Sequence, residues 1–377
     1  MPITPITPIT PKTPHSIIDS DGHIVEADSA WTDFLDPRFL DFVPRPIREG
    51  EEFYFQSGAV EGFRMRARPE TLSAPRKAGE RSGGQRARRG AADPGHRLAD
   101  MDLEQIGRAM IYPTYGLMIQ GVQDRDAAIA LAKAVNDWLA AYTAHDPTRL
   151  YGVGVLPQTS PEDALAEAKR CIEDLNMVGV WRRPERIPGT PALHDPGYEA
   201  LWSYLAEANR PFALHPGLNG IVPCEELRHR YDDNYSAMHA VHFPMEQIMG
   251  LTDMISFGIL DRHPDLRVAF LETGATWALA QLHRLDEHLE LFGFPEKPKE
   301  KPSDQFRRSG FVSVEEVEPG LTATLEAYPD SVMFASDYPH GDGVFPGAAT
   351  ELLETKALND DQRERVLFKN AERFYSI

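Results

Sequence analysis

The segment DSDGHIVE, residues 19–26, places three carboxylates and one imidazole within eight positions of the chain. It follows directly on the apolar pair Ile17 and Ile18, which is typical of a strand that runs into a core. A buried carboxylate without a partner is energetically costly. The segment is therefore either an acidic polar loop or a strand that ends at a bound cation. Asp19, nearest the apolar pair, is interpreted as a structural hydrogen-bond acceptor rather than a ligand.

Similar side chains follow later apolar segments of the chain. His215 ends PFALH, Glu272 ends LRVAFLE, and Asp337 follows SVMFAS with His340 three residues further on. In a parallel α/β barrel the chemistry is carried by the C-terminal ends of the strands, where side chains from distant segments meet. A cluster of acids and imidazoles at that end indicates a bound cation. The predicted metal ligands are Asp21, His23, His215, Glu272 and Asp337.

The elements that would position these residues alternate between short apolar runs and amphipathic helical patterns. This alternation favours βα units around a parallel sheet. Asp124 and the pair Ser160–Pro161 are typical of helix starts between the runs. The sequence predicts a (β/α)8 TIM barrel; an open doubly wound sheet is the alternative, but no Gly-rich dinucleotide fingerprint follows the first strand. The predicted strands are 16–21, 108–113, 151–157, 178–183, 211–216, 266–272, 310–316 and 331–336.

The barrel domain is predicted to span residues 16–377, after an extended arm at 1–15 that repeats Pro-Ile-Thr. Residues 32–107 form a long insertion after the first strand. Its basic, Gly-rich part at 76–90 is interpreted either as a solvated loop or as a lid or partner contact over the active face.

Charge and composition limit the classes of partner. The net charge of −19 argues against nucleic acid or an anionic membrane as the main partner. No apolar stretch approaches the roughly 18 residues of a membrane span, and the N-terminus does not read as a signal peptide. The two cysteines form no disulfide framework. We therefore expect a cytoplasmic protein that acts on a small molecule.

Several motifs, in their order and spacing, resemble the amidohydrolase-related family, in the branch that includes the aminocarboxymuconate-semialdehyde and γ-resorcylate decarboxylases. They are IDSDGH, NDWLAAYTAHDPTRLYGVGVLP, LHDPGYEALW, ALHPG, LRVAFLETGATWALAQLHRLDEH, FASDYPH and KNAERFYSI. The resemblance implies a TIM barrel with a divalent metal, usually zinc or manganese, and favours a dimer. It matches Asp21 and His23 to the ligand pair of the first strand, His215 to the fifth strand and Asp337 to the eighth.

Glu272 departs from the family pattern. The resemblance implies a histidine after the sixth strand, often an acid/base or electrophilic group in the decarboxylases, and this chain has a glutamate there. A carboxylate does not act as a cationic proton donor at neutral pH unless its pKa is raised.

Two classes of mechanism follow. In the first, a metal held by the predicted ligands lowers the pKa of a bound water from about 15.7 to about 7 for hydrolysis, or chelates a substrate carboxylate for non-oxidative decarboxylation. Asp337 or Glu272 serves as general base, with His340 as a further catalytic group. In the second, the oxygen-rich ligand set favours iron or manganese in a dinuclear O2-dependent monooxygenase, so the predicted cofactor is one or two ions of zinc, manganese or iron. A non-catalytic subunit that has kept the fold is a third possibility.

Substrate contacts are less sharply indicated. Arg182 lies at the end of the fourth predicted strand and suits a substrate carboxylate through a bidentate fork. Glu26 lies just beyond the first strand, and His242 lies on a predicted helix face after the fifth. These three residues are predicted to bind substrate. We expect a homo-oligomer, or a hetero-oligomer with a related subunit.

Overall fold

The computed structural model describes residues 17–50, 52–57, 60–61, 65–66, 88–217, 224–231, 234–341 and 343–377. The predicted arm at 1–15 and nearly all of the basic segment at 76–90 lie outside the described residues. Their interpretations therefore stay predictions.

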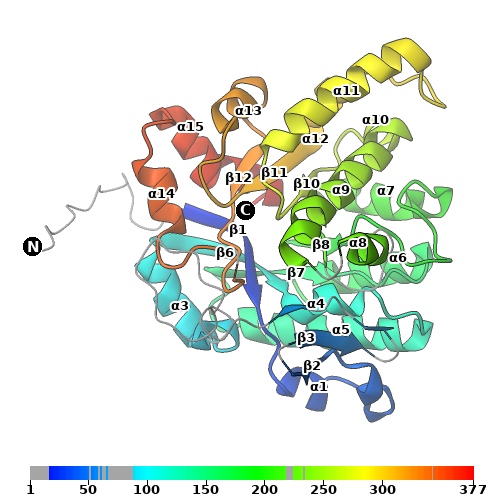
Figure 1. Ribbon diagram of the computed structural model, residues 1–377, viewed down its shortest axis with the longest axis vertical. Helices are drawn as coiled ribbons and strands as arrows, with labels where there is room; N and C mark the ends of the chain where they lie inside the picture. The colour runs from blue at the N-terminus through cyan, green and yellow to red at the C-terminus, as the bar shows by residue number, and fades with distance from the viewer. Residues whose placement is uncertain are drawn as a thin grey trace, which may run out of the picture.

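Eight parallel strands form a nearly closed barrel surrounded by helices (Figure 1). Each strand pairs with the next one along the chain, in the order β1-β6-β7-β8-β9-β10-β11-β12. The predicted TIM barrel is confirmed, and each predicted strand corresponds to one of these eight. They are β1 (Ile17–Ile24), β6 (Ile106–Pro113), β7 (Leu150–Val155), β8 (Gly179–Arg182), β9 (Phe212–Leu214), β10 (Val268–Phe270), β11 (Gly310–Val314) and β12 (Val332–Phe334).

The helices cover the outer face of the barrel. Two predicted helix starts are confirmed, because the side chain of Asp124 accepts from Ala127 N, 2.9 Å away, and that of Ser160 accepts from Asp163 N, 3.2 Å away. The α-helices are α1 (Ser29–Thr32), α3 (Pro94–Leu103), α4 (Thr114–Ile119), α5 (Arg125–Thr143), α6 (Pro161–Lys169), α7 (Glu199–Glu207), α8 (Cys224–Arg230), α9 (Tyr235–Ser256), α10 (Ile259–Arg262), α11 (Thr276–Phe292), α12 (Pro302–Ser309), α13 (Leu321–Ala327), α14 (Ala348–Glu354), α15 (Asp360–Glu364) and α16 (Asn370–Tyr375).

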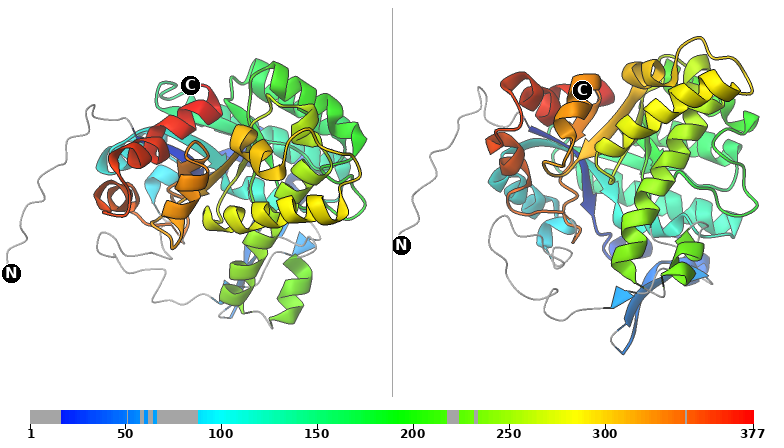
Figure 2. Two further views of the ribbon diagram at one scale, coloured as in Figure 1. Left: turned by 90° about the horizontal axis from the view of Figure 1, so that it is seen from above. Right: turned by 45° about the horizontal axis from the view of Figure 1, so that its top comes forward.

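The insertion after β1 is more than a loop. Its described part holds α1, a 3-10 helix, a small antiparallel sheet and α3, and the strands of the sheet are β2 (Arg45–Glu49), β3 (Glu52–Ser57), β4 (Val60–Glu61) and β5 (Met65–Arg66). Both views of Figure 2 place this sheet at the same end of the molecule as α8 and the first turns of α9. The arrowhead of β1 points toward that end. The small sheet therefore lies at the C-terminal end of the barrel strands.

One side chain on α9 ties the ends of two neighbouring strands together. The fully buried amide of Gln247 donates to Leu214 O and to Leu271 O, each at 2.8 Å. These carbonyls directly precede His215 and Glu272. A buried carbonyl that loses its donor costs free energy, so this amide stabilises both strand ends.

Replacing Gln247 by Leu removes both donors at similar side-chain size. We expect the free energy of unfolding to fall by about 1–3 kcal/mol through the loss of two hydrogen bonds. Each carbonyl keeps one other donor, Leu271 N for Leu214 O at 3.0 Å and Thr273 Oγ1 for Leu271 O at 3.1 Å. Chemical denaturation measures the loss. The control is Gln281→Leu, whose amide bonds only Thr252 Oγ1 in a half-buried position. Equal losses in both variants would contradict the assigned role.

Candidate metal centre

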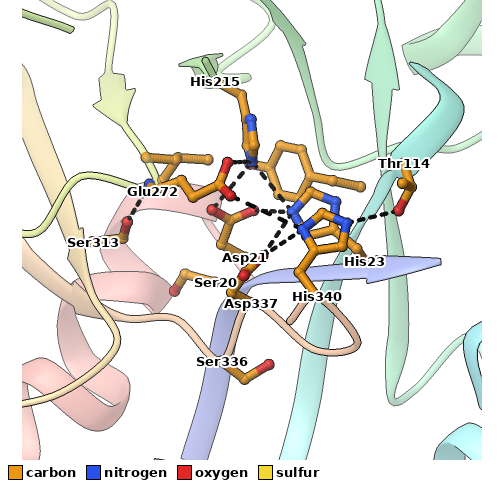
Figure 3. Close-up of polar contacts among 12 residues, drawn as sticks. Ser20, Asp21, His23, Thr114, His215, Glu272, Ser313, Ser336, Asp337 and His340 are labelled. Atoms are coloured by element: carbon orange, nitrogen blue, oxygen red, sulfur yellow. Dashed lines mark hydrogen bonds and ion pairs between the residues drawn. The ribbon is translucent and has the colours of Figure 1, made fainter. Parts of the chain in front are cut away.

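Four of the predicted metal ligands converge from three strand ends (Figure 3). The Nε2 atom of His23 lies 3.2 Å from Nε2 of His215, 3.3 Å from Oδ1 of Asp21 and 3.6 Å from Oδ1 of Asp337. Two ligand atoms about 2.1 Å from one ion are separated by about 3.0–3.4 Å at octahedral or tetrahedral angles. The separations from His23 to Asp21 and His215 match the first coordination sphere of a single ion, and Asp337 lies slightly beyond that range. By mutual distance the potential ligands form two groups that share His23: Asp21, His23 and His215, and His23, Asp337 and His340.

The hydrogen bonds made by His215 and Asp21 test whether a cation fits between their side chains. The Nδ1 atom of His215 lies 2.8 Å from Pro216 O and donates to it, which leaves the Nε2 atom of the neutral ring with a lone pair toward His23. Both carboxylate oxygens of Asp21 are buried and accept no hydrogen bond from the described residues. Lone pairs and carboxylate oxygens that face one another without donors call for a shared cation. The residues therefore fit a divalent metal.

Glu272 and His340 lie beside the same cluster. Oε2 of Glu272 lies 3.3 Å from Nε2 of His215, and its Oε1 lies 4.0 Å from Nδ1 of His340. The same Nδ1 atom is 2.7 Å from Oδ1 of Asp337. The ring of His340 stacks on that of His23, with centroids 4.1 Å apart. All six residues predicted to bind metal or act in catalysis thus meet in one place.

Thr114 belongs to this cluster, and the sequence analysis missed it. Its Oγ1 atom lies 2.9 Å from Nε2 of His340, which leaves both ring nitrogens of this histidine engaged. Thr114 directly follows β6. The rule that found the acids, polar side chains at strand ends, would have found it had hydroxyl groups been included.

The backbone directs two of the acids into the centre. Glu272 and Asp337 have φ angles of 55° and 50°, in the left-handed region that residues with a Cβ rarely adopt. Such conformations cost on the order of 1 kcal/mol or more each and persist where neighbouring contacts fix them. Here Glu272 N donates to Ser313 Oγ at 3.1 Å, and Asp337 N donates to Asp21 O at 2.9 Å.

Glu26 is held away from the ligand cluster. Its two carboxylate oxygens accept from Tyr115 N and Gly116 N, at 2.8 and 3.0 Å, in the first turn of α4. Burial raises the pKa of Glu26 to about 7, and these backbone donors oppose the shift. The geometry is that of an acid at a helix start, where the sequence analysis predicted a substrate contact.

Arg182 points into the helix layer rather than the barrel mouth. Its Nη1 atom donates to the hydroxyl of Tyr198 at 2.7 Å, and its Nε to Arg183 O at 3.2 Å. The reason is strand alternation: Trp181 packs against His215 inside the barrel, so its neighbour Arg182 faces outward. A substrate at the centre would therefore not meet the predicted guanidinium.

His242 lies in a second buried cluster. Its Nε2 atom is 3.6 Å from Oε1 of Glu246, one turn further along α9. The same oxygen is 2.6 Å from Nη2 of Arg183, and Glu246 Oε2 accepts from Gly217 N at 3.2 Å. Burial alone would raise the pKa of Glu246, but Arg183 and His242 hold it below its usual value. Gly217 stands two residues after His215, so this cluster borders the metal centre.

Electrostatics at the centre depend on burial. Burial raises the pKa of Asp21 to about 7, while His215 opposes the shift and Asp19 adds to it. A cation on the ligand set would favour the charged carboxylate, so binding of a metal must displace a proton at moderately acidic pH.

Eight parallel strands with histidines and acids gathered at their C-terminal ends define a metal-dependent TIM-barrel enzyme. The family model described as amidohydrolase matches residues 18–377. The chain belongs to the amidohydrolase family. No helix in the described part of the chain is long and apolar enough to span a membrane.

Individual relatives agree with this assignment. The γ-resorcylate decarboxylase of Rhodococcus jostii is 26% identical over 294 residues, covering 74% of this chain and 87% of that enzyme. An amidohydrolase from Mycobacterium avium subsp. paratuberculosis has a similar structure, with a TM-score of 0.75, 21% identity and coverage of 96% and 99%. A dihydroxybenzoic acid decarboxylase from Polaromonas, crystallised with manganese and 2-nitroresorcinol, has a TM-score of 0.67 and 19% sequence identity. That match covers 96% of this chain and 97% of the Polaromonas chain.

These comparisons bear on the predicted family, metal and mechanism. The resemblance to the decarboxylase branch is confirmed, and the predicted divalent metal agrees with the manganese in the Polaromonas structure and with the ligand geometry here. The relatives give no support to the dinuclear monooxygenase.

Metal affinity should depend on pH through Asp21. The pKa of this carboxyl, about 7 in the folded metal-free protein, is about 3.9 in an unfolded chain. Its contribution to the stability of the metal-free protein is present below pH about 4 and is lost as pH rises toward about 7. Since the metal replaces this proton, the apparent Mn2+ affinity should be about 20-fold weaker at pH 5.5 than at pH 7.5.

Calorimetric titration of metal-free protein at the two pH values measures this change. Glu26→Gln is the control, because Glu26 has a similarly raised pKa outside the ligand set and should leave the pH dependence intact. An affinity that does not change between the two pH values would exclude a proton on Asp21.

Proposed function

We propose that this enzyme catalyses the non-oxidative decarboxylation of a small hydroxylated aromatic acid. Asp21, His23, His215 and Asp337 would hold one divalent ion. The observation that carries the proposal is the position of His340, which lies 2.7 Å from the proposed ligand Asp337. A candidate proton donor therefore lies directly beside the proposed metal ligands. The named activities of the Rhodococcus and Polaromonas relatives support the substrate class.

Decarboxylation requires an exchange of CO2 for a proton at one carbon. The bond between that carbon and the carboxyl group breaks, its electron pair stays on the substrate carbon, and CO2 leaves. A bound divalent ion supplies positive charge that holds and polarises the oxygens of the substrate. The proton would be delivered to the carbon by His340, whose Nδ1 atom lies 2.7 Å from Oδ1 of Asp337, and Thr114, at Nε2 of His340, would orient the ring for this transfer.

Glu272 favours a second candidate, the hydrolysis of an ester, amide or lactone. Its carboxylate lies beside His215 and His340, where a water molecule could be deprotonated before it attacks a carbonyl. A glutamate at this position suits a general base better than the cationic donor that the family resemblance implies there.

The small sheet of the insertion lies at the C-terminal end of the barrel strands, which supports a role of the insertion as a lid over the site during turnover. An oligomeric assembly, with itself or a related subunit, and a cytoplasmic location both stay predictions from the sequence.

Isotope labelling should separate the two candidate reactions. With Mn2+-loaded enzyme and γ-resorcylate in D2O, we expect CO2 release and one deuterium at the carbon that lost the carboxyl group, detected by mass spectrometry. A panel of lactones and aryl esters in 18O-labelled water provides the comparison. Incorporation of 18O into an acid product, without any CO2 release from hydroxybenzoates, would refute the decarboxylase proposal and support hydrolysis.

His340 should be needed for proton delivery but not for metal retention. In His340→Asn the four proposed ligands remain, so metal content should be unchanged while kcat falls by about 10²–10⁴. Elemental analysis and steady-state kinetics check both parts. Wild-type turnover would remove His340 from the proton path.

Glu272→Gln keeps shape but removes the charge, and it tests the second candidate directly. If decarboxylation is the reaction, turnover should stay within about tenfold of wild type; a general base for hydrolysis would instead be worth about 10²–10⁴ in rate. Rates on the hydroxybenzoate and on the ester panel decide between them. A loss of more than 100-fold in CO2 release would show that decarboxylation needs Glu272. It would contradict the assignment of Glu272 as a general base for hydrolysis alone.

A further inference from the structure

Arg97 is a buried cation that the proposed reaction does not use. It lies on α3, in the insertion, and is 1% exposed. Its Nη1 atom donates to the backbone carbonyl of His23 at 2.9 Å, and its Nη2 atom lies 3.5 Å from Oδ2 of Asp19. The guanidinium also lies over the ring of Tyr338, 4.3 Å from its centroid. One side chain thus contacts the first barrel strand and the segment that follows the last one.

Asp19 extends these contacts to the segment after β12 that carries Asp337. Its Oδ1 accepts from Ser336 N at 2.9 Å and its Oδ2 from Ser336 Oγ at 2.6 Å. Its Oδ1 also lies 3.3 Å from Asp21 N. Ser336 directly precedes Asp337. The carboxylate therefore joins the backbone of one proposed ligand to the neighbour of another.

The seam between the first and last strands runs through the same residues. His23 N donates to Tyr338 O at 2.5 Å, and Asp337 N donates to Asp21 O at 2.9 Å. The space next to Gly22 is filled: a Cβ atom there would lie 2.2 Å from Arg97 Nη2 and 2.6 Å from an Asp19 oxygen. The guanidinium fills the space directly behind the ligand pair of β1.

The chemistry of this position suits arginine in particular. A guanidinium presents several donors in a fixed plane and stays charged at every physiological pH. It can bond a carbonyl, pair with a carboxylate and stack on an aromatic ring at the same time, as Arg97 does. A lysine ammonium is a point donor and cannot reproduce that combination.

We propose that Arg97 is a positioning residue of the metal centre. It fixes the carbonyl of His23 directly and the backbone of Asp337 through Asp19 and Ser336, so that ligands from both ends of the barrel sequence face one ion. The proposal rests on the ligand set assigned under the proposed function. Outer partners that orient metal ligands typically contribute 10- to 100-fold to metal affinity.

The test compares Arg97→Met with Arg149→Met. Arg149 is a matched control: its Nε and Nη2 donate to Gly107 O and Ile106 O at 3.0 and 2.8 Å, and its Nη1 lies 2.9 Å from Asp102. These contacts are made at the N-terminal end of β6, away from the ligands. We expect Arg97→Met to bind Mn2+ about 10- to 100-fold more weakly in calorimetric titration. Arg149→Met should lose stability yet keep affinity within about twofold.

Rescue distinguishes positioning from general destabilisation. Added guanidinium at millimolar concentration should recover part of the Mn2+ affinity of Arg97→Met and should not affect Arg149→Met. The electron paramagnetic resonance spectrum of bound Mn2+ should broaden in Arg97→Met and narrow again on rescue. If Arg97→Met does not fold, Arg97→Lys takes its place, with an expected loss of several-fold in Mn2+ affinity.

Wild-type affinity in Arg97→Met, or in Arg97→Lys where that variant is used, would overturn the proposal, as would equal losses in the Arg97 and Arg149 variants. Asp21→Asn separates this outcome from failure of the ligand set. Loss of Mn2+ in Asp21→Asn with normal binding in the Arg97 variant would refute only the positioning role. Retained Mn2+ in Asp21→Asn would refute the ligand set itself.

Discussion

Three carboxylates, those of Asp21, Glu272 and Asp337, are largely withdrawn from water within a few ångströms of three imidazoles. Removing charges from water is costly, and mutual repulsion of the acids adds to the cost. A cation bound by the proposed ligand set would offset both terms. Strand ends, left-handed turns and a buried arginine all serve to hold this repulsive group together, and the fold is organised around that requirement.

Within the cluster the side chains divide into two overlapping groups. Asp21, His23 and His215 form one set of potential ligands, and His23, Asp337 and His340 form another. His23 is common to both, and its ring lies stacked beneath that of His340. In the proposed reaction, charge stabilisation and proton transfer would be carried out by adjacent parts of one cluster. A change in either group alters the electrostatic surroundings of the other, so substitutions here are expected to be non-additive.

Sequence pattern predicted the eight strands and their polar ends, because apolar periodicity and strand-end chemistry are local properties. Asp21, His23, His215 and Asp337 were found in this way, and their convergence followed from barrel geometry. The sequence did not show which way Arg182 faces. Side chains along a strand alternate between the two faces, and because Trp181 packs against His215 inside the barrel, Arg182 faces outward. Arg97 carried no signal, because its partners are 74 and 78 residues away in the chain. Glu26 could not be separated from a substrate contact without the position of α4.

The seam of the barrel joins residues that are more than three hundred positions apart: Asp21 and His23 come from the first strand, and Asp337 follows the last. During synthesis the first strand emerges long before its partner exists. The ligand set can be completed only after the C-terminal part of the chain has been made and docked. Products truncated before Asp337 would lack this proposed carboxylate ligand and the closing hydrogen bonds together. Metal binding by the proposed ligand set would therefore report that translation has passed this residue.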